Sequence, residues 1–392
     1  MLKVLMMGGR RCGKTSALAS LFNQMIHGKT NDFLTVADDT ILEKKIDPVT
    51  HKEEVQDSLD NKQLELVHFI EKGGNNTFLV DAGPTRNYWK YDLRVQIPGT
   101  SKETVLRFWD SAGEFFDAGG AHHQAVVNFV KDCDVFVVVV DTPYLMASSQ
   151  SVSHAANVVD SIHTFLTNIT NHGGGEKKQV IFVPIKCEKW FREKRINEVV
   201  EKVEMAYSAT INHLIASNST EINIIPILTA GDILFTELRD PYLLYNTVTK
   251  TKIKCAKVSD RKVVLKNGKF HAVQSFEVLN EDPEGVFTYL DNSGTEQKTS
   301  IPRPSAWYRL PTDKKPEYCP YNCEQLPLYI IRFMFNKMEE KALGGILGKL
   351  FGKIFGTITQ DDMRHALFEL TQKGLIKENV DGIKTIKGCF NS

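Results

Sequence analysis

The residues best suited to chemistry form one short stretch near the start of the chain. It reads Gly8-Gly9-Arg10-Arg11-Cys12-Gly13-Lys14-Thr15 and satisfies the pattern G-x-x-x-x-G-K-[ST]. In such a loop the glycines let backbone N–H groups face an anion, and the following helix adds partial positive charge. Lys14 is expected to reach the β- and γ-phosphates of a nucleoside triphosphate, and the Thr15 hydroxyl to bind Mg²⁺. The predicted phosphate site comprises Gly8, Gly9, Arg10, Arg11, Cys12, Gly13, Lys14, Thr15 and Ser16.

The elements on either side of this loop support the prediction. Leu2 to Met7 is a short apolar run and predicts a buried strand. Ser16 to Ile26 carries apolar residues at helical spacing and stops at Gly28. Strand, glycine-rich turn and helix are the setting in which this pattern binds phosphate.

Further apolar runs alternate with helical stretches along the chain. Parallel strands are expected at about 91–97, 104–110, 134–141, 178–185 and 222–228. Helices are expected at 151–170, 190–217 and 326–338. This alternation predicts an α/β fold with a doubly wound, mostly parallel sheet.

Two insertions interrupt the predicted domain, which extends over residues 1–342. The first, 29–87, is expected to be helical, with a polar helix at 44–72. The second, 240–320, is expected to be β-rich and contains a hairpin at 261–270 that turns at Asn267-Gly268. Its basic residues fit either a solvated edge or contact with an anionic partner: Lys250, Lys252, Lys254, Lys257, Arg261, Lys262, Lys266 and Lys269.

Residues 343–392 are expected to form a separate C-terminal extension. Apolar residues from 343 to 358 follow helical spacing, and glycines at every fourth position form a second stripe. This amphipathic helix is a candidate for docking on a membrane surface, on a protein partner or on its own domain. Residues 361–387 predict a helix and a hairpin, an arrangement that resembles a small winged-helix unit.

A second motif with chemical meaning lies at the end of a predicted strand, Phe108-Trp109-Asp110-Ser111-Ala112-Gly113-Glu114. Asp110 is placed to bind Mg²⁺, and the Gly113 amide to meet the γ-phosphate. The segment is similar to the W-D-T-A-G-Q-E switch II motif of Ras-like GTPases, with Glu114 where those proteins have glutamine. The resemblance also implies a switch I threonine that binds Mg²⁺, for which Thr85 is the candidate.

The same resemblance implies a site for the base. Ras-like proteins use N/T-K-x-D, and the corresponding residues here are Ile185-Lys186-Cys187-Glu188. Lys186 is expected to stack on the base and Glu188 to contact the guanine edge, while Ile185 cannot make the usual polar contacts. The S-A-K element of the family corresponds to Thr229-Ala230-Gly231, so Thr229 and Ala230 complete the predicted nucleotide site.

Hydrolysis without the usual glutamine requires another group. Arg10 and Arg11 occupy positions where Ras-like proteins need glycine, and guanylate-binding members of the dynamin-like GTPases use an arginine at the position of Arg11 as an internal arginine finger. The resemblance therefore implies Arg11, Glu114 and Lys14 as catalytic residues. The alternative is that both arginines point outward to an acidic partner or a neighbouring subunit.

These motifs identify the chain as similar to Ras-like P-loop GTPases, and its layout resembles the bacterial double-GTPase-type branch. The resemblance implies a Mg²⁺-dependent molecular switch that binds GTP and GDP, hydrolyses GTP slowly, and contacts protein partners through its switch regions, insertions and C-terminal extension. A nucleotide-binding scaffold with little turnover and an ATPase are the alternatives.

Composition limits the other classes of protein. The 392 residues carry a formal net charge of +0, so no overall field indicates nucleic acid as a partner. Seven cysteines scattered along the chain do not form a disulfide framework, and Cys319 and Cys323 have no second pair at metal-ligand spacing. There is no signal peptide pattern and no apolar run of the roughly 20 residues that span a bilayer. We expect a cytoplasmic protein, with peripheral membrane association through 343–358 as a candidate.

Overall fold

A computed structural model of the chain contains two compact units. The first comprises the described residues of Met1–Thr77, Ala82–Leu234 and Leu310–Ser392, and the second includes those of Phe235–Arg309. The structure describes residues 2–9, 12–27, 36–46, 53–72, 88–96, 103–111, 130, 133–148, 150–172, 176–239, 242–246, 251–255, 258–259, 262–264, 270–272, 277–281, 286–290, 296–300, 305–310, 315–343 and 360–390.

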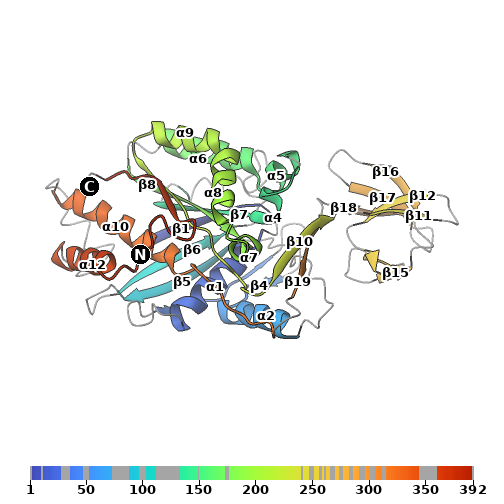
Figure 1. Cartoon of the computed structure of the whole chain (residues 1–392), viewed down its shortest axis with the longest axis horizontal. Coiled ribbons are helices and arrows are strands. Elements are labelled where there is room, and N and C mark those ends of the chain that lie inside the picture. The colour runs from blue at the N-terminus through green and yellow to red at the C-terminus, as the bar shows by residue number, and fades with distance from the viewer. Residues whose placement is uncertain are drawn as a thin grey trace. The chain divides into compact units, whose positions relative to one another are not determined.

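The first unit is built on an eight-stranded mixed sheet in the order β2-β5-β6-β1-β7-β8-β9-β20 (Figure 1). The five strands from β6 to β9 in this order are parallel, as predicted, while β5 is antiparallel to β6, β2 to β5 and β20 to β9. The strands are β1 (Leu2–Met7), β2 (Val36–Asp38), β5 (Trp89–Gln96), β6 (Glu103–Asp110), β7 (Val135–Asp141), β8 (Lys178–Ile185), β9 (Thr220–Ile224) and β20 (Lys384–Lys387).

The orientation of β5 differs from the prediction. The run at 91–97 was expected to be parallel to its neighbours, but β5 pairs antiparallel with β6 over its whole length, from Trp89 opposite Asp110 to Gln96 opposite Glu103. Only residues 97–102 connect the two strands. A parallel crossover needs a dozen or more residues, so a connection this short permits only a hairpin.

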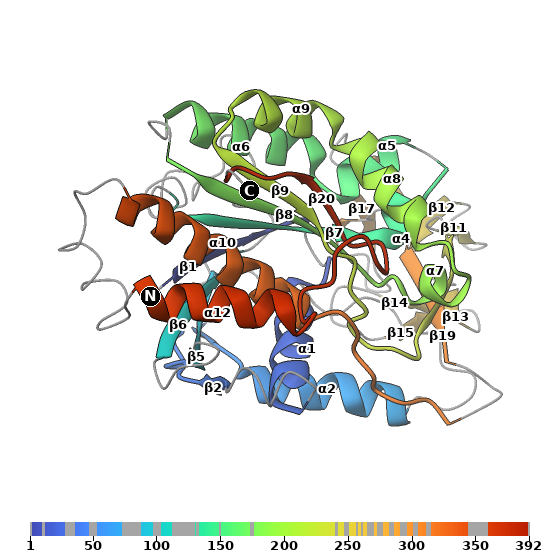
Figure 2. The ribbon, with the colours of Figure 1, turned by 60° about the vertical axis from the view of Figure 1, so that its left-hand side comes forward.

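Helices cover both faces of the sheet (Figure 2). On one face lie α1 (Lys14–His27), α10 (Gln325–Leu343) and α12 (Gln360–Gln372), and on the other lie α6 (Val159–His172), α8 (Ile196–Ala206) and α9 (Ser208–Ala216). Shorter helices are α4 (Thr142–Leu145), α5 (Gln150–Ala156) and α7 (Glu188–Arg192). The sheet is therefore doubly wound, a mostly parallel arrangement compatible with an α/β P-loop fold.

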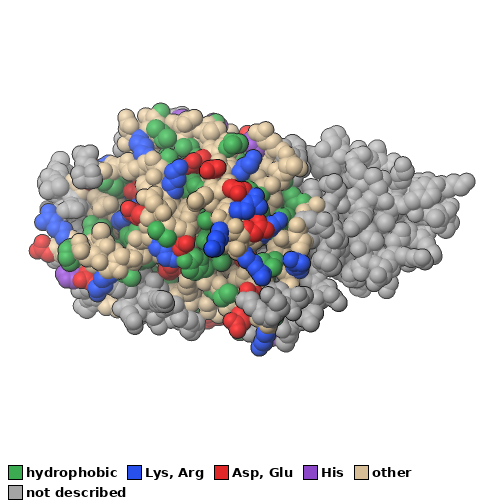
Figure 3. Space-filling model, in the orientation of Figure 1, with side chains coloured by type: hydrophobic (Ala, Val, Ile, Leu, Met, Phe, Trp, Pro, Cys, Tyr) green, Lys and Arg blue, Asp and Glu red, His purple; other side chains and the backbone are tan. Residues whose placement is uncertain are grey.

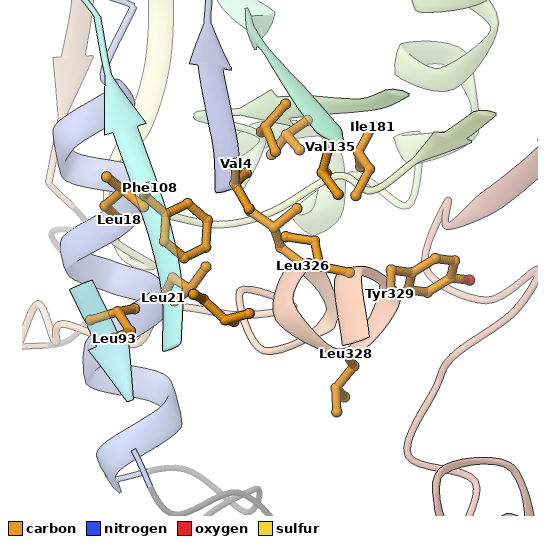
Figure 4. Close-up of a cluster of buried hydrophobic side chains, with 14 of the residues drawn as sticks. Val4, Leu18, Leu21, Leu93, Phe108, Val135, Ile181, Leu326, Leu328 and Tyr329 are labelled. Atoms are coloured by element: carbon orange, nitrogen blue, oxygen red, sulfur yellow. The ribbon is translucent and has the colours of Figure 1, made fainter. Parts of the chain in front are cut away.

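One buried cluster joins the sheet to α1 and α10 (Figure 4). Val4, Val135 and Ile181 point to this face from three neighbouring strands, because alternate residues of a strand share a face. Leu21 of α1 and Leu326 of α10 pack against them. The helix that follows the glycine-rich loop is thus anchored on the central strands.

The described part of the insertion between α1 and β5 is only partly helical. Residues 44–46 and 53–58 do not belong to the predicted helix: β3 (Lys44–Ile46) and β4 (Glu53–Val55) form an antiparallel pair, and α2 spans Leu59–Lys72. Pro48 is incompatible with the interior of a helix, and the N–H of Asn61 donates to Ser58 Oγ at 3.1 Å, which caps α2 at Ser58.

The C-terminal residues also differ from the predicted separate extension. The predicted helix at 361 onward is α12, whose residues Ala366 and Leu370 belong to the same buried cluster as α10. The predicted hairpin is absent from the described part of the chain, because β20 pairs with β9 and covers the edge of the central sheet. Residues 344–358 of the predicted amphipathic helix lie outside the described residues.

The second unit contains small antiparallel sheets. In the predicted hairpin, Val264 pairs with Phe270 and Lys262 with Ala272, which confirms its antiparallel pairing, while the turn at Asn267-Gly268 lies outside the described residues. The strands are β10 (Leu234–Arg239), β11 (Tyr242–Asn246), β12 (Thr251–Cys255), β13 (Val258–Ser259), β14 (Lys262–Val264), β15 (Phe270–Ala272), β16 (Glu277–Glu281), β17 (Val286–Leu290), β18 (Glu296–Ser300) and β19 (Ser305–Arg309).

Basic and acidic side chains are interspersed over the described face of the first unit (Figure 3). Among the helices that the structure describes, none is both long and apolar enough to cross a membrane.

Candidate nucleotide-binding site

The topology itself indicates where a ligand should bind. β1 has β6 on one side and β7 on the other, so the strand order reverses direction at β1. In open α/β sheets, ligands bind outside the carboxyl ends of the strands at such a point. The glycine-rich loop follows the carboxyl end of β1, and Asp110 and Asp141 end the two neighbouring strands.

Two positions in the loop require glycine. Gly8 has φ +148°, and a Cβ at this residue would lie 2.6 Å from the carbonyl oxygen of Val139 in β7. Gly13 has φ +104°, and its Cβ would lie 2.9 Å from Cδ1 of Ile185. Both values of φ are unfavourable for L side chains, and both sites lack space for a side chain. The loop therefore packs directly onto the ends of β7 and β8.

Lys14 places a buried cation over this loop. Its Nζ donates to the carbonyl oxygens of Gly8 at 3.2 Å and Gly9 at 3.1 Å, and the side chain is buried. Among the described residues, no carboxylate forms an ion pair with Lys14. Asp110 interacts with Lys14 electrostatically without a direct ion pair, and a buried ammonium that is not directly paired favours an anionic ligand that contacts it.

Thr15 and Asp110 meet beside Lys14. The Thr15 hydroxyl donates to Asp110 Oδ2 at 2.5 Å, although the two residues are 95 positions apart. The other oxygen, Asp110 Oδ1, is buried and has no hydrogen-bond partner in the described part of the chain. Burial raises the pKa of Asp110, while Lys14 and the Thr15 hydroxyl lower it. An additional cation would satisfy Oδ1 and stabilise the ionised carboxylate.

These two residues fit the predicted Mg²⁺ site. Hydroxyl and carboxylate oxygens are the ligands that Mg²⁺ prefers, and it is usually held by one or two carboxylates together with substrate phosphates. The described residues contain no group of three or more His, Cys, Asp or Glu that could hold a metal alone. Thr85, the third predicted ligand, lies outside the described residues.

Lys186 makes a contact that the motif did not predict. Its Nζ lies 2.6 Å from Asp141 Oδ2, and Asp141 is almost fully buried at the end of β7. Lys186 has φ +58°, a left-handed conformation that is uncommon outside glycine. Its aliphatic stem passes close to Gly13. The side chain predicted to stack on a base is therefore held between the glycine-rich loop and an aspartate.

Glu188 and Ala230 also lie together. The backbone N–H of Ala230 donates to Glu188 Oε1 at 3.2 Å, and both residues are buried. Burial raises the pKa of Glu188 to about 7, although backbone N–H groups and Lys186 oppose this effect. The two segments predicted to contact the base are thus adjacent, with a carboxyl group and an amide donor 42 residues apart in sequence.

The remaining predicted residues divide into two groups. Cys12 is buried, with the pKa of its thiol raised by burial, Ser16 is half-buried in α1, and Thr229 is buried next to Ala230. Arg10, Arg11, Gly113 and Glu114 lie outside the described residues, so their roles stay predictions.

The motifs missed three residues that support the site. Asp141 ends an otherwise apolar strand, and this single polar residue at the carboxyl end of a parallel strand was the available signal. Ser20, which is buried in α1, donates to the carbonyl of Thr229 at 2.6 Å, and Tyr318 donates to Ser20. No pattern in the sequence identifies these two residues.

No protein-family model matches this chain, and no curated protein matches its sequence. A similar solved structure is that of Methanosarcina barkeri Roco2 RocCORdC bound to GDP. The similarity covers 58% of this chain and 43% of that chain, with 13% sequence identity and a TM-score of 0.23. This chain therefore matches less than half of the length of that protein, and the functional interpretation rests on the residues of the site.

Proposed function

We propose that this chain binds a purine nucleoside triphosphate together with Mg²⁺, prefers guanine, and hydrolyses the nucleotide slowly as a molecular switch. The observation that carries the proposal is the buried ammonium of Lys14, which lies over a glycine-rich loop at the carboxyl end of the central strand. An anion with several phosphate groups suits this cation and the amino end of α1.

The described residues suit phosphoryl transfer, in which catalysis consists mainly of positioning and of stabilising charge. Lys14 neutralises charge on the phosphates, and Thr15 and Asp110 would hold Mg²⁺. When bound, the cation would neutralise charge that develops on the β- and γ-phosphate oxygens. Arg11 and Glu114 complete the proposed catalytic set as an arginine finger and a residue that orients water.

The contact between Glu188 and Ala230 supports the preference for guanine. The edge of guanine offers N–H donors to a carboxylate beside a carbonyl oxygen that accepts from an amide. Since Glu188 Oε1 and Ala230 N lie 3.2 Å apart, a single base edge would span both groups by replacing the hydrogen bond between them. Lys186 would stack on the ring.

Adenine is the second candidate, for a reason that concerns the same carboxyl group. With a pKa of about 7, Glu188 is partly protonated at neutral pH. A neutral carboxyl group can donate to a ring nitrogen that accepts, as the edge of adenine requires.

A molecular switch also needs surfaces that report the nucleotide state. Loops that order around the γ-phosphate and relax after hydrolysis are a common device. Partners would then read the state through the switch regions, the insertions and the C-terminal segment.

Thermal unfolding with GTP, GDP, ATP or ADP, with and without Mg²⁺, tests the proposal. A ligand at about 100 times its Kd should stabilise the protein by about 2.7 kcal/mol. Lys14→Ala should abolish this stabilisation, while Lys202→Ala, which removes an exposed lysine of α8, should retain it. The absence of any nucleotide effect in the wild type would refute the proposal. Steady release of phosphate distinguishes a hydrolase from a scaffold.

A further inference from the structure

Residues 318–321, which we call the returning segment, lie along the proposed base loop, which we define as residues 228–231. Leu228 and Tyr321 exchange backbone hydrogen bonds of 3.0 and 3.1 Å, and Gly231 forms a bridge with Tyr318. The N–H of Cys319 donates to the carbonyl of Ala230 at 3.1 Å. The backbone of the base loop is therefore paired with residues 318–321.

A side-chain relay joins the same segment to α1. The hydroxyl of Tyr318 donates to Ser20 Oγ at 3.1 Å, and the hydroxyl of Ser20 donates to the carbonyl of Thr229 at 2.6 Å. Ser20 is fully buried in the helix that begins with Lys14 and Thr15. The relay thus connects the phosphate-binding helix, the base loop and the returning segment.

The base loop and the returning segment cannot shift past each other freely. Gly231 has φ +91°, and a Cβ at this position would lie 2.3 Å from Cys319 Sγ and 2.7 Å from the Cys319 carbonyl oxygen. Ala230 is held on both sides, because its N–H donates to Glu188 and its carbonyl accepts from Cys319. A displacement of Cys319 must therefore move the amide that is proposed to contact the base.

We propose that Tyr318 is a positioning residue for the base loop, which it holds through Ser20 and the carbonyl of Thr229. This inference rests on the proposed function. When a loop is in its binding-competent conformation for only a fraction of the time, the apparent affinity for its ligand is the intrinsic affinity multiplied by that fraction. Loosening the returning segment should therefore weaken the part of binding that depends on the base and leave phosphate binding intact.

Tyr318→Phe tests the positioning role, because it removes the hydroxyl that holds Ser20. Two ligands should be titrated by calorimetry: GDP, and inorganic tripolyphosphate, which has no base. Loss of one hydrogen bond to the relay should lower GDP affinity about five- to tenfold, with tripolyphosphate affinity unchanged. Tyr329→Phe is the matched control, since it removes a tyrosine hydroxyl that donates to Lys377 O at 2.8 Å in the C-terminal region.

Amide hydrogen exchange in the nucleotide-free protein gives an independent measurement. Tyr318→Phe should increase exchange in residues 228–231, and Tyr329→Phe should not. Unchanged exchange and unchanged GDP affinity would overturn the positioning role, as would an equal loss for GDP and tripolyphosphate, which indicates general damage to the fold. If the wild type bound no nucleotide, the proposed function and the effect of Tyr318 on affinity would both fail. Faster exchange of residues 228–231 in Tyr318→Phe would still show that Tyr318 holds the base loop.

Discussion

Glu188→Gln should remove a pH-dependent loss of stability from the protein. Burial raises the pKa of Glu188 from 4.5 to about 7. The folded state therefore binds this proton more tightly than the unfolded state does. The resulting stabilisation is fully present below pH 4.5 and is lost as the pH rises through 7. Glutamine resembles the protonated carboxyl group in shape and cannot ionise, so the variant should not show this loss.

The magnitude follows from the two pKa values. The step from 4.5 to about 7, at 1.36 kcal/mol for each pKa unit, corresponds to roughly 3 kcal/mol of unfolding free energy. Lys186 favours the ionised carboxylate and is already included in the value of 7. The buried thiols of Cys187 and Cys323 have pKa values raised well above 9, so they remain neutral over the relevant range.

Urea unfolding of both proteins between pH 4 and pH 8 measures this difference. As the pH rises across this range, the unfolding free energy of Glu188→Gln should increase by about 3 kcal/mol relative to that of the wild type, because every other titrating group is common to both proteins. Glu201→Gln removes a similar charge from an exposed position of α8 and should show no such gain. A free-energy difference between wild type and Glu188→Gln that stays constant with pH would refute the burial of an ionisable carboxyl group at Glu188.

Three further predictions concern the phosphate end of the site. Asp110→Asn should abolish the increase in nucleotide affinity that Mg²⁺ causes, measured by titration with and without EDTA, because the amide is neutral; an undiminished Mg²⁺ effect would place the cation elsewhere. Gly13→Ala should lower the unfolding free energy, measured in urea, by about 1–3 kcal/mol, because its φ is +104° and its Cβ would meet Ile185. In the control Gly374→Ala, φ is +62° and the Cβ has open space, so the loss should be about 1 kcal/mol. Equal losses in the two variants would argue against close packing of the loop. Arg11→Ala should slow single-turnover GTP hydrolysis at least tenfold with GDP affinity nearly unchanged, and equal rates would exclude an internal arginine finger.

Features that depend on neighbouring residues were predictable from the sequence. The glycine-rich loop, its strand and its helix lie within the first 27 residues, and their pattern specifies the local backbone. The same holds for the apolar strand β7, and for α12, which begins next to Asp361. The antiparallel orientation of β5 was also available from the sequence, because the six residues between β5 and β6 are too few for a crossover.

Other features required the tertiary structure. Residues 384–387 form a short polar run whose pairing depends on the exposed edge of β9, about 160 positions earlier in the chain. Composition and periodicity describe the run itself and carry no information about that edge, so an independent hairpin was an equally consistent interpretation. The Asp110–Thr15 and Glu188–Ala230 contacts were expected only in the sense that a shared ligand would bring those residues together.

The sequence by itself therefore determined the proposed phosphate site, because contiguous residues form a loop whose geometry depends on glycines and on the helix that follows. The tertiary structure decided how the base loop is held. Ser20, Thr229 and Tyr318 come from three segments, with Ser20 and Tyr318 separated by 298 positions. Serine, threonine and tyrosine are common residues, and their hydrogen bonds arise only where α1, the loop after β9 and the returning segment meet in the folded chain.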